Sequence, residues 1–218
     1  MRRRKGLYEK YFKRLIDLFC GYSALIVFWW LYLLLTVLGA IFMRGNPFFT
    51  QDRPGKNGKV FKLIKFRTMD NRKDKKGKLL PDELRLNKYG RFLRKTSLDE
   101  IPEVFNIIRG DMSVIGPRPL LVKYLKLYNE EQRHRHDVRP GLTGYAQAHG
   151  RNALSWEDKF AMDVWYTRHI SFICDLRILW DTILSVIKRD GIGSEDSVTT
   201  EEFKGTPPGV KATWRAPH

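Results

Sequence analysis

The chain has 218 residues, enough for one folded domain with appendages, and its 40 Lys and Arg residues against 24 Asp and Glu give a formal net charge of +16. Its two cysteines, Cys20 and Cys174, lie far apart and indicate neither a disulfide framework nor a cysteine-based metal site. The positive charge belongs to the first part of the chain, because everything after residue 95 sums to −1. A basic surplus of this kind is typical of proteins that bind nucleic acid or an anionic membrane.

A long apolar segment decides between these two partners. Leu18–Met43 holds 26 residues without a charged side chain, and as a straight helix it would measure about 39 Å, more than the roughly 30 Å of a bilayer core. The core helix of a soluble protein is rarely apolar for so long. A cleaved signal peptide has a shorter apolar core followed by small residues, whereas this run ends in bulky side chains and Arg44. We therefore expect a retained anchor in an anionic phospholipid membrane, and no nucleic-acid partner.

Both flanks of the anchor are basic, which bears on its topology. Residues 1–14 carry seven basic side chains against Glu9 alone, and residues 52–95 carry sixteen against five acids. Because the cytoplasmic flanks of membrane segments are rich in Lys and Arg, both ends favour the same side of the bilayer. A re-entrant helix, which dips into the membrane and returns, satisfies both ends. The alternative is an ordinary span with residues 1–14 inside.

The other elements predict an α+β fold that is mostly helical with a minor strand content. An amphipathic helix leads into the anchor, because apolar residues recur at helical spacing over Gly6–Asp17. Strands are expected within 47–51 and 60–69, a charged surface loop at 70–81, helices at 83–93, 96–108, 120–135, 161–169 and 172–189, and a glycine-rich loop at 139–152. The expected organisation is a membrane anchor at 1–46, one small cytosolic domain at 47–205 and an irregular tail at 206–218.

Two adjacent carboxylates, Asp99 and Glu100, are the first candidates for chemistry. One interpretation is structural: Ser97 with Glu100 three residues later matches a capping box, and acids favour the first turn of any helix. In the other, the helix dipole keeps Asp99 ionised as a nucleophile towards phosphorus, while Glu100 holds a Mg²⁺. The sequence leaves both interpretations open.

Arginines in restrained backbone form the second group of candidates. Two prolines flank Arg118, and a rigidly presented guanidinium suits bidentate phosphate binding, although a tight turn with a solvent-facing Arg fits equally well. Arg139 and Arg151 lie in a glycine-rich stretch, where main-chain N–H groups can approach an anion. His134 and His136 lack a third ligand nearby, and we interpret them as a charged helix end.

Six motifs together resemble a known family. They are Phe49–Gly55 (FTQDRPG), Lys65–Met69 (KFRTM), Ser97–Glu100 (SLDE), Gly110–Ser113 (GDMS), Gly116–Pro119 (GPRP) and Arg139–Gly141 (RPG). In this order, within a match that runs from Tyr8 to about Phe203, they closely resemble the small monotopic phosphoglycosyl transferases, the bacterial sugar transferase family. The members that start glycan assembly with diacetylbacillosamine phosphate also share Gly150–Asn152 and Trp156.

The resemblance implies a two-step reaction in a catalytic domain at 47–205. Asp99 would attack the β-phosphate of a UDP-sugar and release UMP, and a polyprenyl phosphate, expected to be undecaprenyl phosphate, would then take the phosphosugar. Glu100 would bind Mg²⁺ together with Asp99. Phosphate or substrate contacts are expected from Arg118, Arg139, Arg151, Lys65 and Arg67. The family implies a place in the bacterial inner membrane, with the catalytic domain facing the cytoplasm, at the first membrane step of glycoconjugate assembly.

The resemblance also implies a re-entrant anchor, with one departure. The family's membrane helix usually breaks at a Ser-Pro pair near its middle, a place that falls near Trp29 and Trp30, yet Leu18–Met43 contains no proline. Two other functions fit parts of the sequence: a non-enzymatic module that binds anionic lipid or nucleic acid, and a membrane-bound hydrolase of nucleotide sugars that uses water as the acceptor. The sequence specifies neither the sugar nor the oligomeric state.

Overall fold

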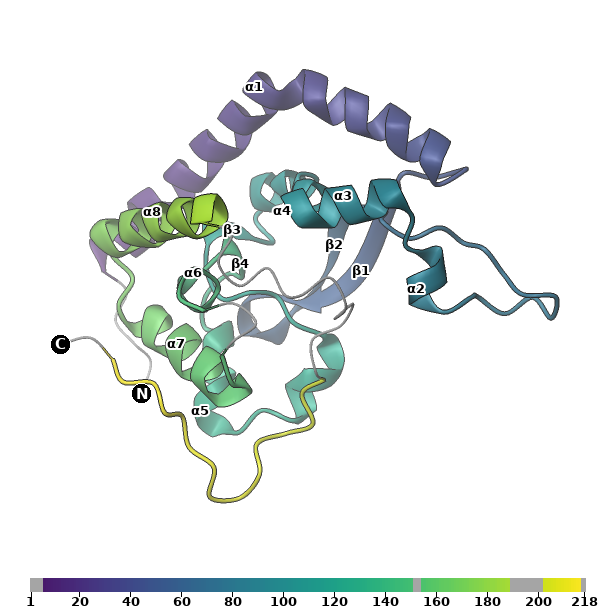
Figure 1. The fold of residues 1–218 in the computed structure, drawn as a ribbon. Helices are drawn as coiled ribbons and strands as arrows, with labels where there is room; N and C mark the ends of the chain where they lie inside the picture. The colour runs from purple at the N-terminus through teal and green to yellow at the C-terminus, as the bar shows by residue number, and fades with distance from the viewer. Residues whose placement is uncertain (1–5, 151–153, 189–201, 217–218) are drawn as a thin grey trace.

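The computed structural model describes residues 6–150, 154–188 and 202–216 (Figure 1). Its helices are α1 Lys13–Phe42, α2 Asp82–Arg85, α3 Lys88–Thr96, α4 Glu103–Arg109, α5 Glu130–Arg133, α6 Tyr145–Ala148, α7 Trp156–Arg168 and α8 Phe172–Lys188, and its strands are β1 Phe48–Pro54, β2 Val60–Phe66, β3 Ser113–Ile115 and β4 Gly141–Thr143. Short helical turns are η1 Tyr8–Phe12, η2 Lys56–Gly58, η3 Leu98–Glu100, η4 Val122–Lys126 and η5 His134–His136. The described fold is mostly helical with little strand, as the sequence predicted.

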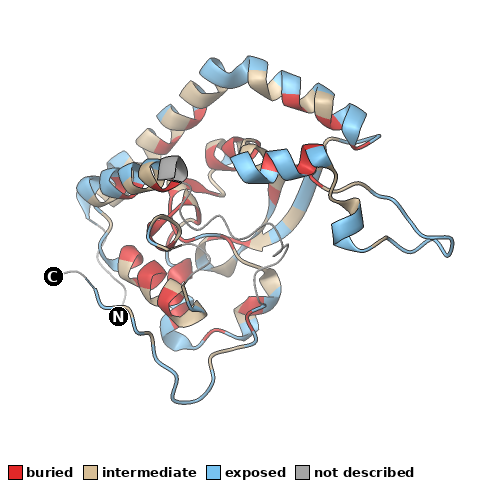
Figure 2. Cartoon of the chain, in the orientation of Figure 1, coloured by how far each residue is buried: buried red, intermediate tan, exposed pale blue. Residues whose placement is uncertain are grey.

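The apolar segment forms α1, which is bent in its middle. With η1 it makes one helix over Tyr8–Phe42 that is long and apolar enough to cross a membrane. The backbone of Phe28 is not helical, with φ −108° and ψ 16°, and the two halves of α1 meet at an angle above the rest of the molecule (Figure 1). The bend lies beside Trp29, where the family resemblance placed it, although no proline is present. Side chains around the bend are exposed, Ile26 to 74% for example, and such a concentration of apolar groups suits lipid better than water (Figure 2).

The first half of α1 is fixed to α4 and β3 by polar contacts. Arg14 donates from Nη1 and Nη2 to the carbonyl oxygens of Ile107 and Ile108, at 2.6 and 2.8 Å. These bonds cap carbonyls in the last turn of α4, where the regular helical pattern of hydrogen bonds runs out. The buried Asp17 accepts at Oδ1 from the Ser113 hydroxyl at 2.8 Å and from the next backbone N–H at 2.9 Å.

The second half of α1 packs on α3 and on the hairpin formed by β1 and β2. Leu35 is 3% exposed, and its carbonyl oxygen accepts from the buried Tyr89 hydroxyl at 2.9 Å. The ring of Tyr32 lies 6.0 Å from that of Phe48 in β1 and 5.4 Å from that of Phe66 in β2, measured between centroids. Both halves of the bent helix are therefore held against the same domain, on either side of its exposed apex.

The β1–β2 hairpin is tied to α4 through one buried amide. The strands pair antiparallel along their whole length. Asn106 of α4 is fully buried, and its Oδ1 accepts from the backbone N–H of Ile64 at 3.0 Å while its Nδ2 donates to the carbonyl oxygen of Lys62 at 2.8 Å. The side chain thereby satisfies the free edge of β2, and it fixes the neighbouring Lys65 over the start of α4.

The rest of the domain is built around β3 and β4, which pair in parallel. An apolar cluster covers this small sheet and comprises Ile115, Tyr145, Ala146, Met162, Tyr166 and Ile178. A second cluster, made of Tyr124, Tyr128, Phe160 and Phe203, lies between η4 and α7 and includes the start of the last described segment. That segment, 202–216, contains no helix or strand, and Asp158 holds it by accepting from the backbone N–H groups of Thr213 and Trp214, at 2.6 and 2.8 Å.

Two of the predicted helices are interrupted, and asparagine caps explain both interruptions. Asn87 accepts from the backbone N–H of Gly90 at 2.8 Å and starts α3 anew, so 83–93 is not one helix. Asn129 forms a capping box and starts α5, so 120–135 is not one helix either. The stretch 139–152, predicted as loop, contains β4 and α6, because a three-residue strand is too short to show alternation.

His136 is buried in the domain rather than part of a charged helix end, and it makes the stability of the fold depend on pH. Its Nδ1 lies 3.3 Å from the carbonyl oxygen of Gly55, and its Nε2 is buried without a partner in the described part of the chain. Burial, with the nearby charge of Arg135, lowers the pKa of His136 to about 4. A group whose pKa is depressed by folding contributes stability above its unfolded pKa and loses that contribution as the pH falls through its folded pKa.

We therefore expect the contribution of His136 to lower the free energy of unfolding by up to about 3 kcal/mol as the pH drops from 7 towards 4. Chemical denaturation in detergent at several pH values measures this free energy of unfolding. A His136→Gln variant is expected to show a weaker pH dependence, whereas His134→Gln, at an exposed position of the same turn, keeps that of the unaltered protein. Identical pH profiles for all three proteins would show that His136 does not titrate in this way.

Candidate active site

A sharp turn between α3 and α4 presents the two candidate carboxylates. Ser97 has φ 55° and ψ 19°, a left-handed conformation that is uncommon for a residue with a side chain, and it ends α3. The η3 turn with Asp99 and Glu100 follows, and α4 begins only at Glu103. The Ser97 side chain makes no capping hydrogen bond, so the capping box and the single helix over 96–108 suggested by the sequence are wrong. Backbone strain of this kind is often found at functional sites.

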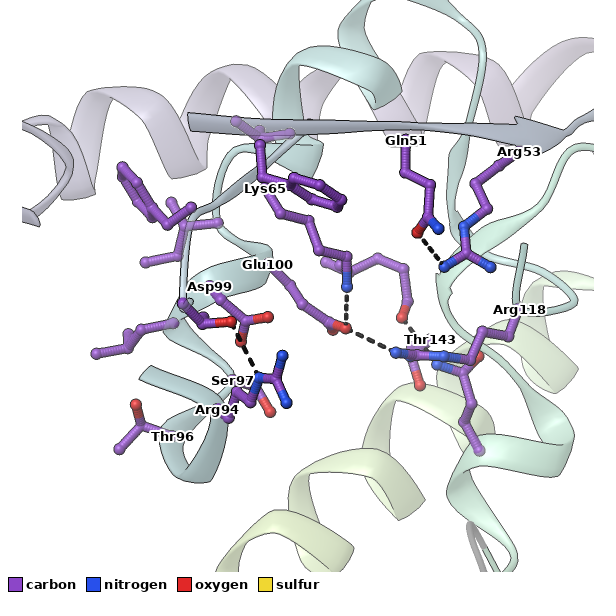
Figure 3. Close-up of a pocket in the computed structure, with 18 of the residues that line it drawn as sticks. Gln51, Arg53, Lys65, Arg94, Thr96, Ser97, Asp99, Glu100, Arg118 and Thr143 are labelled. Carbon is purple, nitrogen blue, oxygen red and sulfur yellow. Dashed lines mark hydrogen bonds and ion pairs between the residues drawn. The ribbon is translucent and has the colours of Figure 1, made fainter. Parts of the chain in front are cut away.

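Glu100 is held by two cations. Its Oε1 lies 2.7 Å from Lys65 Nζ and 2.8 Å from Arg118 Nη2 (Figure 3). Burial disfavours the charged carboxylate, but Arg118 and Lys65 outweigh it and lower the pKa of Glu100 to about 2. Glu100 is therefore ionised at neutral pH, and its Oε2 has no donor among the described residues.

A third carboxylate, Glu103, completes this cluster. Its Oε1 lies 3.0 Å from Lys65 Nζ, and its side chain is 4% exposed. Burial raises the pKa of Glu103, to about 7, with Lys65 opposing the rise and Glu100 adding to it. Lys65 thus bridges one carboxylate that is firmly ionised and one that is protonated far more easily. The sequence analysis did not select Glu103, although its spacing of three from Glu100 brings the two side chains to one side of the turn.

Asp99 differs from its neighbour because it has no partner. Within the described residues its carboxylate makes no hydrogen bond or ion pair. Burial raises the pKa of Asp99, against the charges of Lys65 and Arg94, so a helix dipole does not dominate its ionisation as the sequence analysis assumed. Arg94 approaches from α3, where its Nε donates to Thr68 Oγ1 at 3.0 Å. A half-buried carboxylate without a partner is free to contact a ligand.

The carboxylates lie in an open cavity of about 2070 Å³ under the bend of α1. One wall is apolar and comes from α1, with Leu25, Phe28 and Leu31 among its side chains. The opposite wall comes from β1, β2, α3, the η3 turn and the loop after β3, and its basic side chains include Arg53, Lys65, Arg94 and Arg118 (Figure 3), with Arg67 after β2. The cavity thus lies between the apolar wall formed by the anchor and a densely charged wall. This arrangement suits a ligand with both lipid and phosphate parts.

The loop that carries Arg118 is held rigid from two sides. Arg135 Nη2 donates to the carbonyl oxygen of Arg118 at 2.8 Å and pairs with Asp163 Oδ2 at 2.6 Å, and the side chains of this pair are 1% and 6% exposed. Gly116 admits no side chain, because a Cβ there would lie 2.4 Å from the carbonyl oxygen of Arg139. The restraint that the flanking prolines suggested is therefore present.

The structure brings most, but not all, of the predicted residues together. Asp99, Glu100, Lys65, Arg67 and Arg118 line the cavity. Arg139 does not line it: its Nε donates to the carbonyl oxygen of Gly110 at 2.8 Å, which holds the turn after α4. Arg151 lies outside the described residues. The cavity is also lined by Arg53 and Arg94, which the sequence analysis missed, and Glu103, which it missed as well, lines a small second cavity of about 60 Å³ together with Lys65 and Arg118. Arg53 lies inside the FTQDRPG motif. Its spacing of two from Gln51 in a strand places both side chains on one face, and this was the signal that could have identified it.

The carboxylates fit Mg²⁺ only if a ligand supplies further oxygens. The described residues contain no group of three His, Cys, Asp or Glu side chains that could hold a metal ion by themselves. Lys65 and Arg118 occupy Oε1 of Glu100, which leaves Oε2 and the carboxylate of Asp99. Mg²⁺ commonly takes one or two carboxylates and completes its shell with substrate phosphates and water. Asp99 and Glu100 therefore suit an ion that arrives with a diphosphate.

Comparison with known proteins gives consistent matches. The family model described as bacterial sugar transferase matches residues 8–189. The uncharacterized sugar transferase EpsL of Bacillus subtilis is 49% identical over 201 residues, which cover 89% of this chain and 96% of that protein. The exopolysaccharide production protein ExoY of Rhizobium meliloti is 37% identical over 191 residues, 80% of this chain and 84% of ExoY.

A longer relative carries a more specific name. The undecaprenyl-phosphate galactose phosphotransferase of Salmonella typhimurium is 32% identical over 204 residues, which cover 84% of this chain but only 42% of that protein. This chain thus spans less than half the length of that relative.

A partnerless carboxylate among basic side chains, beneath an apolar helix, is the arrangement of an enzyme that handles phosphorylated ligands next to a membrane. The chain belongs to the bacterial sugar transferase family, and it is an enzyme of the phosphoglycosyl transferase class, as its motifs indicated.

Proposed function

We propose that the chain transfers a sugar-1-phosphate from a UDP-sugar to undecaprenyl phosphate, giving undecaprenyl-diphospho-sugar and UMP. The observation that carries this proposal is one cavity in which Asp99 and Glu100 lie among basic side chains on one wall, opposite the apolar wall formed by α1. The name of the Salmonella relative, which specifies undecaprenyl phosphate, supports the lipid acceptor. Such an enzyme catalyses the first membrane step of glycoconjugate assembly.

In the first step, an oxygen of Asp99 attacks the β-phosphorus of the donor. A bond forms between that oxygen and phosphorus, the bond from phosphorus to the oxygen bridging the two phosphates breaks, and UMP leaves with the bridging oxygen. Asp99 then carries the phosphosugar as an acyl phosphate. Lys65 and Arg118 lie on the same wall of the cavity as Asp99, and there their charges stabilise the negative oxygens that surround phosphorus during the transfer.

In the second step, a phosphate oxygen of the lipid attacks the same phosphorus. The new phosphorus–oxygen bond completes the diphosphate, and the bond to Asp99 breaks, which returns the free carboxylate. A Mg²⁺ held by Asp99, Glu100 and the diphosphate would supply charge neutralisation and orientation of the phosphates. Arg94, beside Asp99 on the wall of the cavity, is placed to contact the lipid phosphate.

The same proposal places the domain on the cytoplasmic face of the bacterial inner membrane, with α1 re-entrant. The support is geometric: both halves of α1 are bound to one domain, while the apex around Phe28 is apolar and exposed. A second apolar face lies on α8, where Phe172, Ile173, Leu176 and Trp180 are each more than half exposed. UDP-sugars are made in the cytosol and the acceptor phosphate lies at the bilayer surface, so a domain on that surface reaches both.

The test is UMP release by the detergent-solubilised protein from a panel of UDP-sugars, with Mg²⁺ and undecaprenyl phosphate. The panel includes UDP-galactose, after the name of the Salmonella relative, UDP-glucose as its epimer, and UDP-diacetylbacillosamine, after the motifs. We expect release that depends on both lipid and Mg²⁺ with one of these donors. Release of UMP at the same rate without lipid, with free sugar phosphate as the product, would instead establish a hydrolase.

A further inference from the structure

Arg53 is a cation in the cavity that has no acidic partner. It lies two residues after Gln51 in β1, so both side chains point to the same face of the hairpin, and its Nη2 donates to Gln51 Oε1 at 2.6 Å (Figure 3). In the described part of the chain, no carboxylate lies within ion-pair distance of its guanidinium. Its Nε is buried and makes no hydrogen bond there either.

Arg53 also shares its surroundings with a like charge. Arg53 and Arg118 both line the main cavity (Figure 3), and both also line a second cavity of about 60 Å³. Burial and the charge of Arg118 lower the pKa of Arg53, with Glu103 opposing, so its cation is less well stabilised here than it is in water. An anion bound between the two guanidinium groups removes this penalty and accepts the unused N–H donors.

The position of Arg53 along the cavity indicates which anion this is. β1 starts at Phe48, whose ring packs on Tyr32 of α1 at 6.0 Å, and Arg53 lies five residues further, about 16 Å along an extended strand. β1 contacts η4, and the carbonyl oxygen of Gly55, directly after β1, lies 3.3 Å from His136 Nδ1 of η5. Arg53 is therefore at the end of the cavity remote from α1, whereas Arg94 comes from α3, which packs beneath α1 (Figure 1).

We propose that Arg53 and Arg118 bind the phosphate of the nucleotide half of a nucleoside diphosphate sugar. The inference rests on the proposed function and adds a polarity to the site. The nucleotide occupies the end of the cavity remote from α1, the phosphorus that is transferred lies over Asp99, and the lipid phosphate approaches from the α1 side. Arg53 thus contacts the donor and its UMP product, and it makes no contact with the acceptor.

Direct binding separates this inference from the proposed reaction. Calorimetric titration of the detergent-solubilised protein uses UDP and UMP as nucleotide probes and farnesyl phosphate as a lipid-phosphate probe. Arg53→Gln is expected to weaken the binding of both nucleotides by roughly tenfold to a hundredfold, the usual effect of losing charge-assisted hydrogen bonds, and to leave farnesyl phosphate binding unchanged. In turnover assays the same variant raises the KM for the donor more than it lowers kcat.

Two further variants serve as controls. Arg109→Gln removes the same charge from an exposed position at the end of α4 and is expected to bind all three probes normally. Arg53→Lys retains the charge but not the planar fork, so it should give an intermediate nucleotide affinity, and it replaces the Gln variant if that protein fails to fold.

Each other outcome has a definite meaning. Unchanged nucleotide binding in a folded Arg53→Gln protein overturns the inference while the proposed reaction stands. Weakened binding of farnesyl phosphate alone assigns Arg53 to the acceptor and also overturns it. Failure of the unaltered protein to bind either nucleotide rejects the donor class, and with it both proposals.

Discussion

An Asp99→Asn variant is expected to release UMP at least about 10³-fold more slowly than the unaltered protein, because an amide oxygen cannot form the acyl phosphate. UDP binding should persist, since Asn has the same shape and Lys65 and Arg118 remain in place. The measurement combines UMP release with intact-protein mass spectrometry after incubation with the donor alone. Only the unaltered protein should gain the mass of a phosphosugar.

The stability of the Asp99→Asn protein separates chemistry from folding. Burial raises the pKa of Asp99, so replacing the carboxylate by a neutral amide should leave the melting temperature equal or slightly higher. Asp52→Asn, which changes an exposed carboxylate in β1, is the matched control and should retain full turnover. Near-normal turnover by the Asp99 variant would remove this residue from the role of nucleophile.

The buried pair of Arg135 and Asp163 is expected to give the largest effect on stability. An Asp163→Leu variant leaves the Arg135 guanidinium buried without its counter-ion, at a cost of about 3–5 kcal/mol. A double variant, Arg135→Met with Asp163→Leu, replaces the pair by apolar groups and should recover most of that loss. Chemical denaturation of the three proteins in detergent measures both changes.

Turnover by the double variant then tests whether the pair positions Arg118. Arg135 donates to the carbonyl oxygen of Arg118, and the double variant lacks this donor even when it is folded. We expect stability to return while UMP release stays reduced by about tenfold, with the loss in kcat/KM for the donor. A double variant that regained both stability and turnover would leave the pair with a purely structural role.

The sequence predicted those parts of this molecule that depend on local pattern. The apolar run became α1, the segments predicted as strands within 47–51 and 60–69 gave β1 and β2, and the SLDE motif and Arg118 of the GPRP motif line one cavity. Segments governed by a single side chain were less predictable. Asn87 and Asn129 each restart a helix inside a segment that reads as continuous.

The sequence predicted which motif residues line the site, but it did not predict which of their side chains form ion pairs. No spacing rule indicates that Lys65 of β2 reaches both Glu100 and Glu103, because that contact depends on Asn106 fastening the strand to α4. Arg139 illustrates the converse error. A glycine-rich context suggested an anion contact, but Nε of the Arg139 guanidinium donates to the carbonyl oxygen of Gly110.

The bent helix has a practical consequence for anyone who wants a water-soluble form of this enzyme. In many membrane-bound enzymes the anchor is a tether that can be trimmed without harm to a separately folded catalytic unit. Here α1 forms a wall of the cavity and satisfies the end of α4 through Arg14. Cutting the chain after residue 42 would open the cavity and expose the aromatic surface around Phe48 and Tyr89. Solubility is better sought by redesigning the outward face of α1 than by deleting it.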